Sequence, residues 1–73
     1  MDEYARIVTT VGEDIRHLLD MRGLTIRDLG MCECTAEKYA RGQAMPGILT
    51  LIHIASKLDA HLEIRLVPNE KVL

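Results

Sequence analysis

Apolar residues near the start of the chain recur at spacings of three and four, the period of one helix face. The stripe consists of Tyr4, Ile7, Val8, Val11, Ile15, Leu18 and Leu19. The opposite face is mostly charged, as expected for a solvated surface. This pattern predicts a helix over residues 4–22, in which Gly12 is a weak point because glycine costs about 1 kcal/mol relative to alanine. Gly23 then provides a left-handed stop, and Leu24 folds back onto the last turn.

Polar and glycine residues then mark two short helices. Thr25 with Asp28 three positions later resembles an N-terminal capping box, which predicts a second helix over residues 26–31. Leu29 points inward, and Gly30 weakens any continuation. Thr35 is expected to cap a third helix over residues 36–41, with Tyr39 and Ala40 facing inward and Gly42 as its stop.

The last third of the chain changes from helical to alternating periodicity. Pro46 suits the start of a fourth helix over residues 47–58. Its predicted buried face consists of Ile48, Leu51, Ile52, Ala55 and Leu58. Beyond Asp59 and Ala60, apolar and polar residues alternate, which predicts a β-strand over residues 61–67 and a loose tail over residues 69–73. A single strand leaves its backbone groups unpaired, so we expect it to pair with the same strand of a second subunit. The dimerisation residues would be Leu62, Ile64 and Leu66.

Size and composition favour one small helical domain. The chain has 73 residues, 48% of them apolar, with no Phe or Trp. This suits a mainly α bundle of about four helices forming a single domain over residues 1–73. A lone core in a chain of roughly 70 to 80 residues seldom yields more than a few kcal/mol, which also favours a partner subunit.

Charge and hydropathy argue against a membrane partner and mildly against a nucleic-acid partner. The net charge of −2 and pI near 5.8 give no overall attraction to phosphate, although a local basic stripe could form. No apolar run approaches the roughly 20 residues needed to cross a bilayer. The acidic start Asp2-Glu3 lacks the positive charge of a signal peptide. We therefore expect a cytoplasmic protein without membrane association.

The chemistry-bearing residues form no recognisable catalytic set. Cys32 and Cys34 are the only cysteines, too few for a disulfide framework. A zinc site would need His17, His53 or His61, whose spacing does not suggest convergence. We expect reduced, small buried thiols and no metal or cofactor; a redox role stays open if the thiols are exposed. No nucleophile, base and orienting group assemble, so we expect no enzyme and no catalytic residues.

The order of these elements resembles that of a known regulator family. The features that carry the resemblance span residues 12–68: Leu24-Thr25 opening the second helix, Leu29 inside it, Gly30-Met31 at the turn, Arg41-Gly42 closing the third helix, Pro46 with Ile48, Leu51, Ile52, Ala55 and Leu58, and the closing HLEIRLVP. Together they are similar to the Cro and cI-repressor type of helix-turn-helix protein, the xenobiotic-response-element family. Compared with that family, the second helix is shorter by about four residues, roughly one turn.

The resemblance implies a lambda-repressor-like fold that binds a double-stranded DNA operator. The third helix would lie in the major groove, braced by the second across the backbone. The implied DNA-binding residues are Thr25, Arg27, Glu33, Thr35, Glu37, Lys38 and Arg41. Glutamate can accept from the cytosine amino group and lysine can donate to guanine. Phosphate contacts would be made by Thr25, Arg27, Lys38 and Arg41.

Two functions remain open at this point. The first is a homodimeric, sequence-specific transcriptional regulator, phage-repressor-like or antitoxin-like. The second is a protein-interaction module or small inhibitor on a helix-turn-helix scaffold that no longer binds DNA. The second interpretation depends on Ile26, Met31, Met45 and Leu49, because a cluster of exposed apolar side chains marks a protein partner more often than a DNA surface. The same residues could instead pack a dimer or fill space left by the shortened helix.

Overall fold

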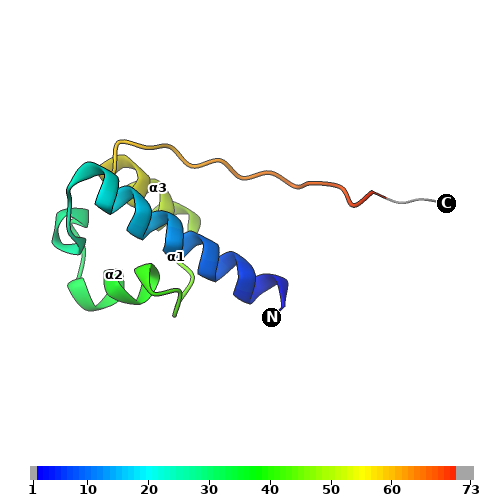
Figure 1. Ribbon diagram of the computed structural model, residues 1–73, viewed down its shortest axis with the longest axis horizontal. Helices are drawn as coiled ribbons and strands as arrows, with labels where there is room; N and C mark the ends of the chain where they lie inside the picture. The colour runs from blue at the N-terminus through cyan, green and yellow to red at the C-terminus, as the bar shows by residue number, and fades with distance from the viewer. Residues whose placement is uncertain (1, 71–73) are drawn as a thin grey trace.

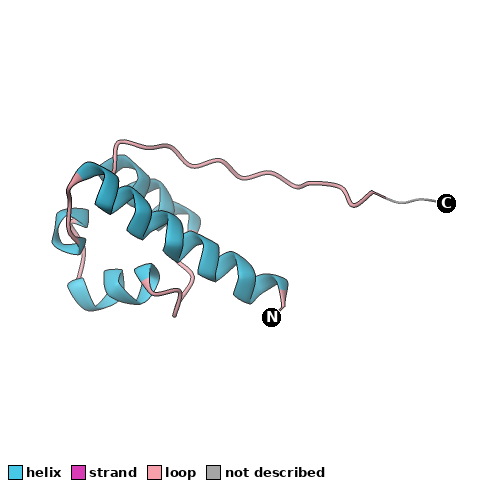
Figure 2. Ribbon diagram, in the orientation of Figure 1, coloured by secondary structure: helices cyan, strands magenta, loops and turns pink. Residues whose placement is uncertain are grey.

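The computed structural model describes residues 2–70, which form a small, mainly helical bundle (Figure 1). Its elements are α1 (Glu3–Arg22), the 3-10 helix η1 (Ile26–Leu29), α2 (Glu33–Ala40) and α3 (Ile48–Lys57). The mainly α class predicted from composition is confirmed. Of the four helices expected, three are α-helices and one is a short 3-10 helix, and residues 2–70 contain no β-strand (Figure 2).

Helix α1 is the long support against which the other helices pack. The Asp2 carboxylate accepts a hydrogen bond from the Ala5 backbone N–H at 2.7 Å, and the helix ends where Gly23 turns left-handed at φ 65°. The stop predicted at Gly23 is confirmed. The predicted stripe is correct in the middle of the helix but wrong at its N-terminal end, where Tyr4 is 65% and Ile7 is 43% exposed. The N-terminal end of α1 projects beyond the other helices (Figure 1), which agrees with the exposure of its apolar side chains.

Gly12 is a packing requirement instead of the weak point that its helix propensity suggests. It is buried against the C-terminal end of α2, and a Cβ atom placed on it would lie 2.9 Å from the carbonyl oxygen of Ala40. The carbonyl of Tyr39 would be equally close, at 2.9 Å. One turn further along α1, the Arg16 guanidinium donates to the same Ala40 carbonyl. The absence of a side chain at Gly12 therefore allows α1 and α2 to approach closely.

The second helix is shorter than predicted. The Asp28 carboxylate accepts from the Thr25 backbone N–H at 2.7 Å and from its hydroxyl at 3.3 Å, as the predicted capping arrangement requires. Gly30 then takes a left-handed conformation, φ 72°, so the helix ends at Leu29 and not at residue 31. Leu29 is nearly inaccessible, at 1% exposure, and anchors η1 in the core as expected.

The third helix begins earlier than predicted. It starts at Glu33, and Cys32 occupies the N-cap position, so Thr35 lies inside the first turn and is not the cap. Ala36 and Ala40 are buried and Tyr39 is half-buried, in agreement with the predicted inward face. Gly42 follows the helix with φ 71° and donates its N–H to the Tyr39 carbonyl, so the predicted stop is confirmed.

Helix α3 presents a different face to the core from the one its apolar pattern predicts. Gly47 is the N-cap, and the buried side chains are Leu51, Ile54 and, at the C-cap, Leu58. Ile54 was absent from the predicted set, whereas Ile48 and Ile52, predicted as buried, are 59% and 49% exposed. The apolar stripe is thus wider than the core of a single chain can cover.

Two polar contacts fix α3 to the rest of the bundle. At its C-terminal end, the Arg22 guanidinium donates to the carbonyl oxygens of Leu58 at 3.0 Å and Asp59 at 3.1 Å. Near its middle, the Nε2 atom of His53 lies 2.9 Å from the carbonyl oxygen of Leu29. Each contact satisfies a backbone carbonyl at the end of a helix, where no intrahelical donor remains.

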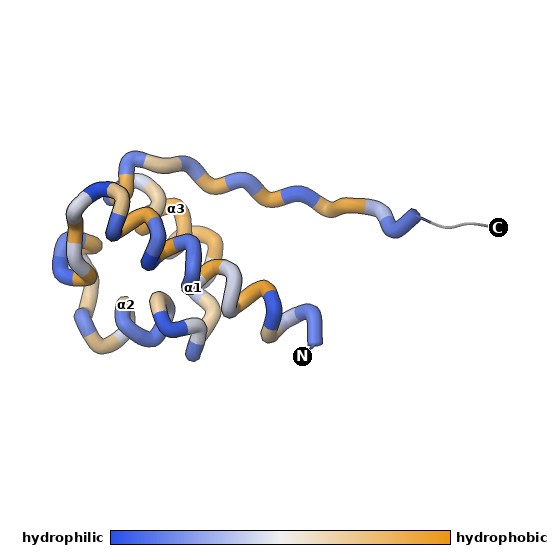
Figure 3. The backbone as a smooth tube through the Cα atoms, in the orientation of Figure 1, coloured by the Kyte–Doolittle hydropathy of each residue, from blue (hydrophilic) through white to orange (hydrophobic). Residues whose placement is uncertain are grey.

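Residues 61–70 form an extended segment without regular secondary structure, whose first residues lie along the bundle and whose later residues run away from it (Figure 1). Apolar and polar residues alternate along it (Figure 3). The β-strand predicted over residues 61–67 is not formed within the single chain, where the described residues give this segment no backbone hydrogen bond. Of the predicted tail over residues 69–73, residues 71–73 lie outside the described part of the chain.

Candidate nucleic-acid interface

Helix α2 is anchored on one face and free on the other. Ala36 and Ala40 are buried at 0% and 2% exposure, and their small side chains let α2 lie close to α1 and to Leu29 of η1. Every residue predicted to contact DNA is exposed: Thr25, Arg27, Glu33, Thr35, Glu37, Lys38 and Arg41. These residues lie on η1, its N-cap, α2 and the α2 C-cap, so the structure gathers them on two neighbouring elements.

The two glutamates of this surface are each paired with an arginine. Arg27 Nε lies 3.3 Å from Glu33 Oε2, which connects η1 to the first residue of α2. Arg41 Nη2 lies 2.7 Å from Glu37 Oε1, one helical turn apart on α2. Exposed pairs of this kind contribute only about 0 to 1 kcal/mol to stability. Their larger effect is electrostatic, because they bring positive charge to the carboxylates that would oppose a polyanion.

Lys38 is the most available cation of the surface. Within residues 2–70 its ammonium group takes part in no ion pair, whereas both arginines are engaged. The seven side chains carry three positive and two negative charges, which gives a net charge of +1. Thr25 is partly engaged as well, because its hydroxyl donates to Asp28 at 3.3 Å. The seven candidate side chains are therefore weakly cationic within an acidic protein, and the exposed Asp28 beside Thr25 offsets that charge.

Cys32 and Cys34 are exposed, contrary to the expectation that they are buried. Hydrogen bonds from the Thr35 backbone N–H, then from the Cys34 N–H and the Thr35 side chain, hold the pKa of the Cys32 thiol below its usual value. These N–H groups belong to the first turn of α2, which has no intrahelical acceptors for them. The sequence favoured Thr35 as the N-cap because threonine is a common capping residue, whereas the cysteine that takes this position, Cys32, is a rare one.

The apolar residues proposed for a protein partner do not form one exposed cluster. Ile26 and Met31 pack against the core, and Met45 is half-buried. Leu49 on α3 is the exception, at 83% exposure. Ile26 and Met31 therefore contribute to packing around the core instead of forming an exposed patch with Leu49.

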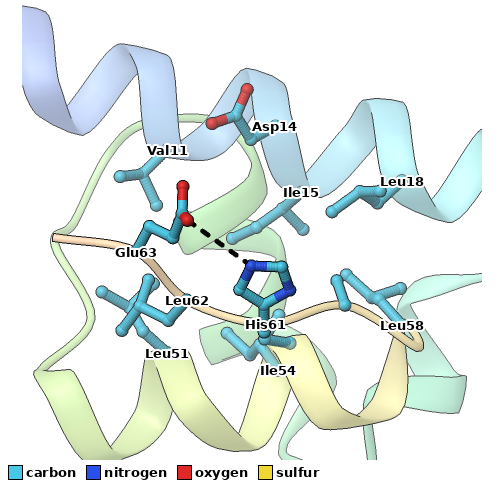
Figure 4. Close-up of a pocket in the computed structure, with 12 residues that line it drawn as sticks. Val11, Asp14, Ile15, Leu18, Leu51, Ile54, Leu58, His61, Leu62 and Glu63 are labelled. Atoms are coloured by element: carbon cyan, nitrogen blue, oxygen red, sulfur yellow. Dashed lines mark ion pairs between the residues drawn. The ribbon is translucent and has the colours of Figure 1, made fainter.

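A groove of about 400 Å³ separates α1 from α3, and the first residues of the extended segment lie along it (Figure 4). Among the predicted dimerisation residues, Leu62 is half-buried here and lies on the α3 side beside Leu51 (Figure 4). Ile64 and Leu66 continue past the groove and are 61% and 98% exposed. Glu63 lies toward α1, with Oε2 at 3.7 Å from His61 Nε2 (Figure 4).

Comparison with known proteins returned no match. No protein family, no curated protein and no solved structure matches the chain. Over residues 2–70, no helix is both long enough and apolar enough to span a bilayer. In the same residues, no group of three or more His, Cys, Asp or Glu side chains converges as a metal site would require.

Proposed function

We propose that the protein is a sequence-specific DNA-binding transcriptional regulator that acts as a homodimer. The observation that carries this proposal is the placement of α2, whose inner face is locked by Ala36 and Ala40 while its outer face is free. A helix that is held rigidly and exposes polar side chains can enter the major groove, as in a helix-turn-helix protein of the Cro and cI-repressor type.

In this proposal, each arginine holds a glutamate in position for base recognition. A glutamate accepts a hydrogen bond from the cytosine N4 amino group, and its ion pair reduces the cost of bringing a carboxylate near phosphate. Glu33 is held by Arg27 and Glu37 by Arg41, at 3.3 and 2.7 Å. Lys38, which has no such ion pair within residues 2–70, would donate to guanine or to a phosphate. The surface would thus recognise a DNA sequence mainly through its glutamates and Lys38, although it carries only three cationic side chains.

The same ion pairs bear on the shortened second helix. The loss of about one helical turn displaces the end of the brace by about 5 Å. Arg27 reaches from η1 to Glu33 and links the short brace to the first turn of α2. This contact supports a fixed angle between the two elements, which simultaneous contact with bases and phosphates requires.

Homodimerisation would occur through the extended segment at residues 61–67. Its alternating pattern fits a β-strand, and its backbone groups have no partners within the described chain. A two-fold pair of such strands would place two α2 helices on a symmetric operator. Cooperation of two half-sites is how small regulators of this class reach useful affinity.

Fluorescence polarisation tests the proposal. The probes would be DNA from upstream of the gene and duplexes selected from a randomised library, each measured at several salt concentrations. Lys38→Ala should weaken operator binding by about tenfold, the effect of losing about 1.4 kcal/mol. Arg6→Ala is the matched control, because Arg6 is exposed on α1 outside the surface. Absence of any selected sequence, or equal binding by both variants, would contradict DNA recognition.

A second function is favoured by Leu49, which is 83% exposed on α3. A large apolar side chain at that exposure, beside the exposed Ile48, is suited to contact with another protein. The protein would then be an interaction module or small inhibitor on a helix-turn-helix scaffold. Affinity capture from the native host with the wild type and with Leu49→Asp tests this alternative. A heterologous protein captured only by the wild type would support it, and recovery of the chain alone would count against it.

A further inference from the structure

In the extended segment, residues of opposite charge lie on the two sides of Ile64 at equal distance, and so do two leucines. Glu63 and Arg65 flank Ile64, and Leu62 and Leu66 lie one position further out on either side. In an antiparallel pair of identical strands, residues equidistant from the two-fold axis lie opposite each other on the same face. An axis at Ile64 therefore places Glu63 opposite Arg65 of the second copy, twice, and Leu62 opposite Leu66.

We propose that two copies of the chain join residues 61–67 as an antiparallel ribbon with Ile64 facing Ile64, and that Leu66 of each copy covers the exposed flank of α3 in the other. This inference rests on the homodimer of the proposed function and specifies its register and contact surface. The α3 flank is defined here as the exposed Ile48 and Ile52 together with the adjoining edge of Leu51, whose side chain is itself buried.

Other symmetric registers are less favourable. An axis at Glu63 places the two Glu63 carboxylates opposite each other, and an axis at Arg65 does the same with two guanidinium groups, which is destabilising. An axis between residues puts apolar side chains opposite charged ones and mixes the two faces. An axis at Leu62 or Leu66 pairs fewer residues of the segment. Only the axis at Ile64 pairs the whole of residues 61–67 so that Glu63 lies opposite Arg65 on one face and apolar groups lie opposite each other on the other, with His61 opposite Val67 at the ends.

The position of Leu62 determines where the partner's Leu66 falls. Leu62 lies beside Leu51 at the α3 side of the groove (Figure 4). A side chain directly opposite Leu62 in an antiparallel ribbon is about 5 Å away, which brings the partner's Leu66 to the α3 flank. Leu66 is 98% exposed in the single chain, and Ile48 and Ile52 of the flank are exposed as well. The contact would bury these apolar surfaces together.

The chain's own Leu66 cannot make this contact. It lies four residues beyond Leu62, a distance of about 13 Å along an extended strand. The segment leaves the bundle in this interval (Figure 1). The Leu66 side chain of a second copy, whose strand runs in the opposite direction, can reach the groove instead.

Charge complementarity supports the same occupant. Asp14 of α1 and Glu63 both line the groove on its α1 side, so two carboxylates lie near the place where the partner's Arg65 would fall (Figure 4). The contact of Glu63 with His61 is long, at 3.7 Å, and both side chains are highly exposed. Such a pair is weak, which leaves the Glu63 carboxylate available to a guanidinium.

A charge-swap cycle tests the register with the full chain. Sedimentation equilibrium would give the dimer dissociation constant of the wild type, Glu63→Arg, Arg65→Glu and the double variant. Each single change converts two attractive pairs into two repulsive ones, so it should raise the dissociation constant by about tenfold, and the double variant should recover to within about threefold of the wild type. Glu70→Arg is the matched control, because residue 70 lies outside the ribbon and should leave the constant unchanged. Unaltered helicity by circular dichroism would show that all variants fold.

Cysteine cross-linking in a Cys32→Ser, Cys34→Ser background gives a second readout. Directly opposite residues in an antiparallel ribbon have Cα atoms about 4.5 to 5.5 Å apart, within disulfide range. Ile64→Cys should therefore form an intermolecular disulfide with itself under mild oxidation. Leu66→Cys alone should not, whereas an equimolar mixture of Leu62→Cys and Leu66→Cys should.

The possible failures are distinguishable. A monomeric wild type would overturn both this inference and the homodimer of the proposed function. A dimeric wild type in which the double variant does not recover, or in which Leu66→Cys cross-links to itself and Ile64→Cys does not, would overturn the register alone. DNA binding is measured separately through Lys38, so its loss or retention does not decide the ribbon.

Discussion

Gly12 of α1 and Ala40 of α2 approach so closely that a Cβ atom on Gly12 would lie 2.9 Å from the Ala40 carbonyl oxygen. Real Cβ atoms do not tolerate such a distance to backbone, so any side chain at residue 12 must push the two helices apart. This close approach therefore helps to set the orientation of α2, and with it that of the candidate DNA-binding surface, together with the buried Ala36 and Ala40.

Gly12→Ala should therefore destabilise the protein although alanine favours helices. The propensity gain is about 1 kcal/mol, whereas steric overlap with two backbone carbonyls costs about 1 to 3 kcal/mol or more, so we expect a net loss of stability. Urea denaturation would measure it. Gly47→Ala is the matched control, because a Cβ atom at Gly47 meets nothing within 4 Å. It should change stability by less than about 1 kcal/mol, through the N-cap alone. A variant at Gly12 as stable as the wild type would contradict the close approach.

Arg22→Ala should loosen the end of the bundle where α1 meets α3. The guanidinium donates to the carbonyl oxygens of Leu58 and Asp59, and no other described side chain replaces these donors. Loss of a charged donor to a partly buried carbonyl costs about 1 to 3 kcal/mol. Thermal unfolding and amide exchange near residues 58–60 would measure the effect. Arg6→Ala, which alters an exposed arginine of the same helix, should change stability by less than about 0.5 kcal/mol.

Glu33→Gln and Glu37→Gln should affect DNA binding more than stability. Each removes an exposed ion pair worth about 0 to 1 kcal/mol, so the unfolding free energy should change little. Each also releases an arginine to contact phosphate, so affinity for random DNA should rise. The slope of log affinity against log salt should become steeper by about one for each arginine that is released. If either glutamate reads a cytosine, selection from a library should show reduced preference at that position. Unchanged salt slopes in both variants would show that the arginines do not reach the DNA.

Cys32 should react with alkylating agents at a lower pH than an ordinary cysteine. Hydrogen bonds from the Thr35 and Cys34 N–H groups stabilise the thiolate and lower its pKa, so more thiolate is present at a given pH below the usual value. Alkylation rates of the Cys34→Ser variant between pH 6 and 10, followed by mass spectrometry, would locate the midpoint. Unfolding in guanidinium removes the helix N-terminus and should return the midpoint to its ordinary position. The same midpoint in folded and unfolded protein would exclude this effect.

Much of the local structure followed from the sequence because single residues determine it. Gly23 and Gly42 take positive φ at the predicted helix stops, and Asp28 accepts from Thr25 as the capping pattern requires. Gly30 also takes positive φ, and it ends the second helix two residues earlier than predicted. The start of α2 was wrong by three residues because Cys32, a rare N-cap, took the place expected of Thr35. Helix caps and stops depend on residues that are close in sequence. Common capping residues can therefore be predicted, whereas a rare one such as Cys32 is missed.

Contacts between distant residues were less predictable. Gly12 looked unfavourable by helix propensity, but its role depends on Ala40, which is 28 positions away. The choice of Ile54 over Ile52 as a buried residue depends on how α3 is rotated against α1, and the apolar pattern of α3 allows both. All seven candidate DNA-binding residues are exposed as the family resemblance implied. The Glu37–Arg41 ion pair has the i,i+4 spacing that a helix sequence indicates, whereas the Arg27–Glu33 pair could not be read from spacing because its residues belong to different elements.

The uncovered apolar side chains of α3 also have a consequence for how the protein behaves on dilution. A lone chain keeps only the small cluster around Leu29, Ile54 and Leu58 out of water, and leaves Ile48, Ile52 and Leu66 in contact with it. If a second copy supplies the missing cover, mass action ties the melting temperature to protein concentration. At a low cellular concentration, a larger fraction of the chains would then be monomeric and less stable. Both the lifetime of the protein and its occupancy of any target would fall.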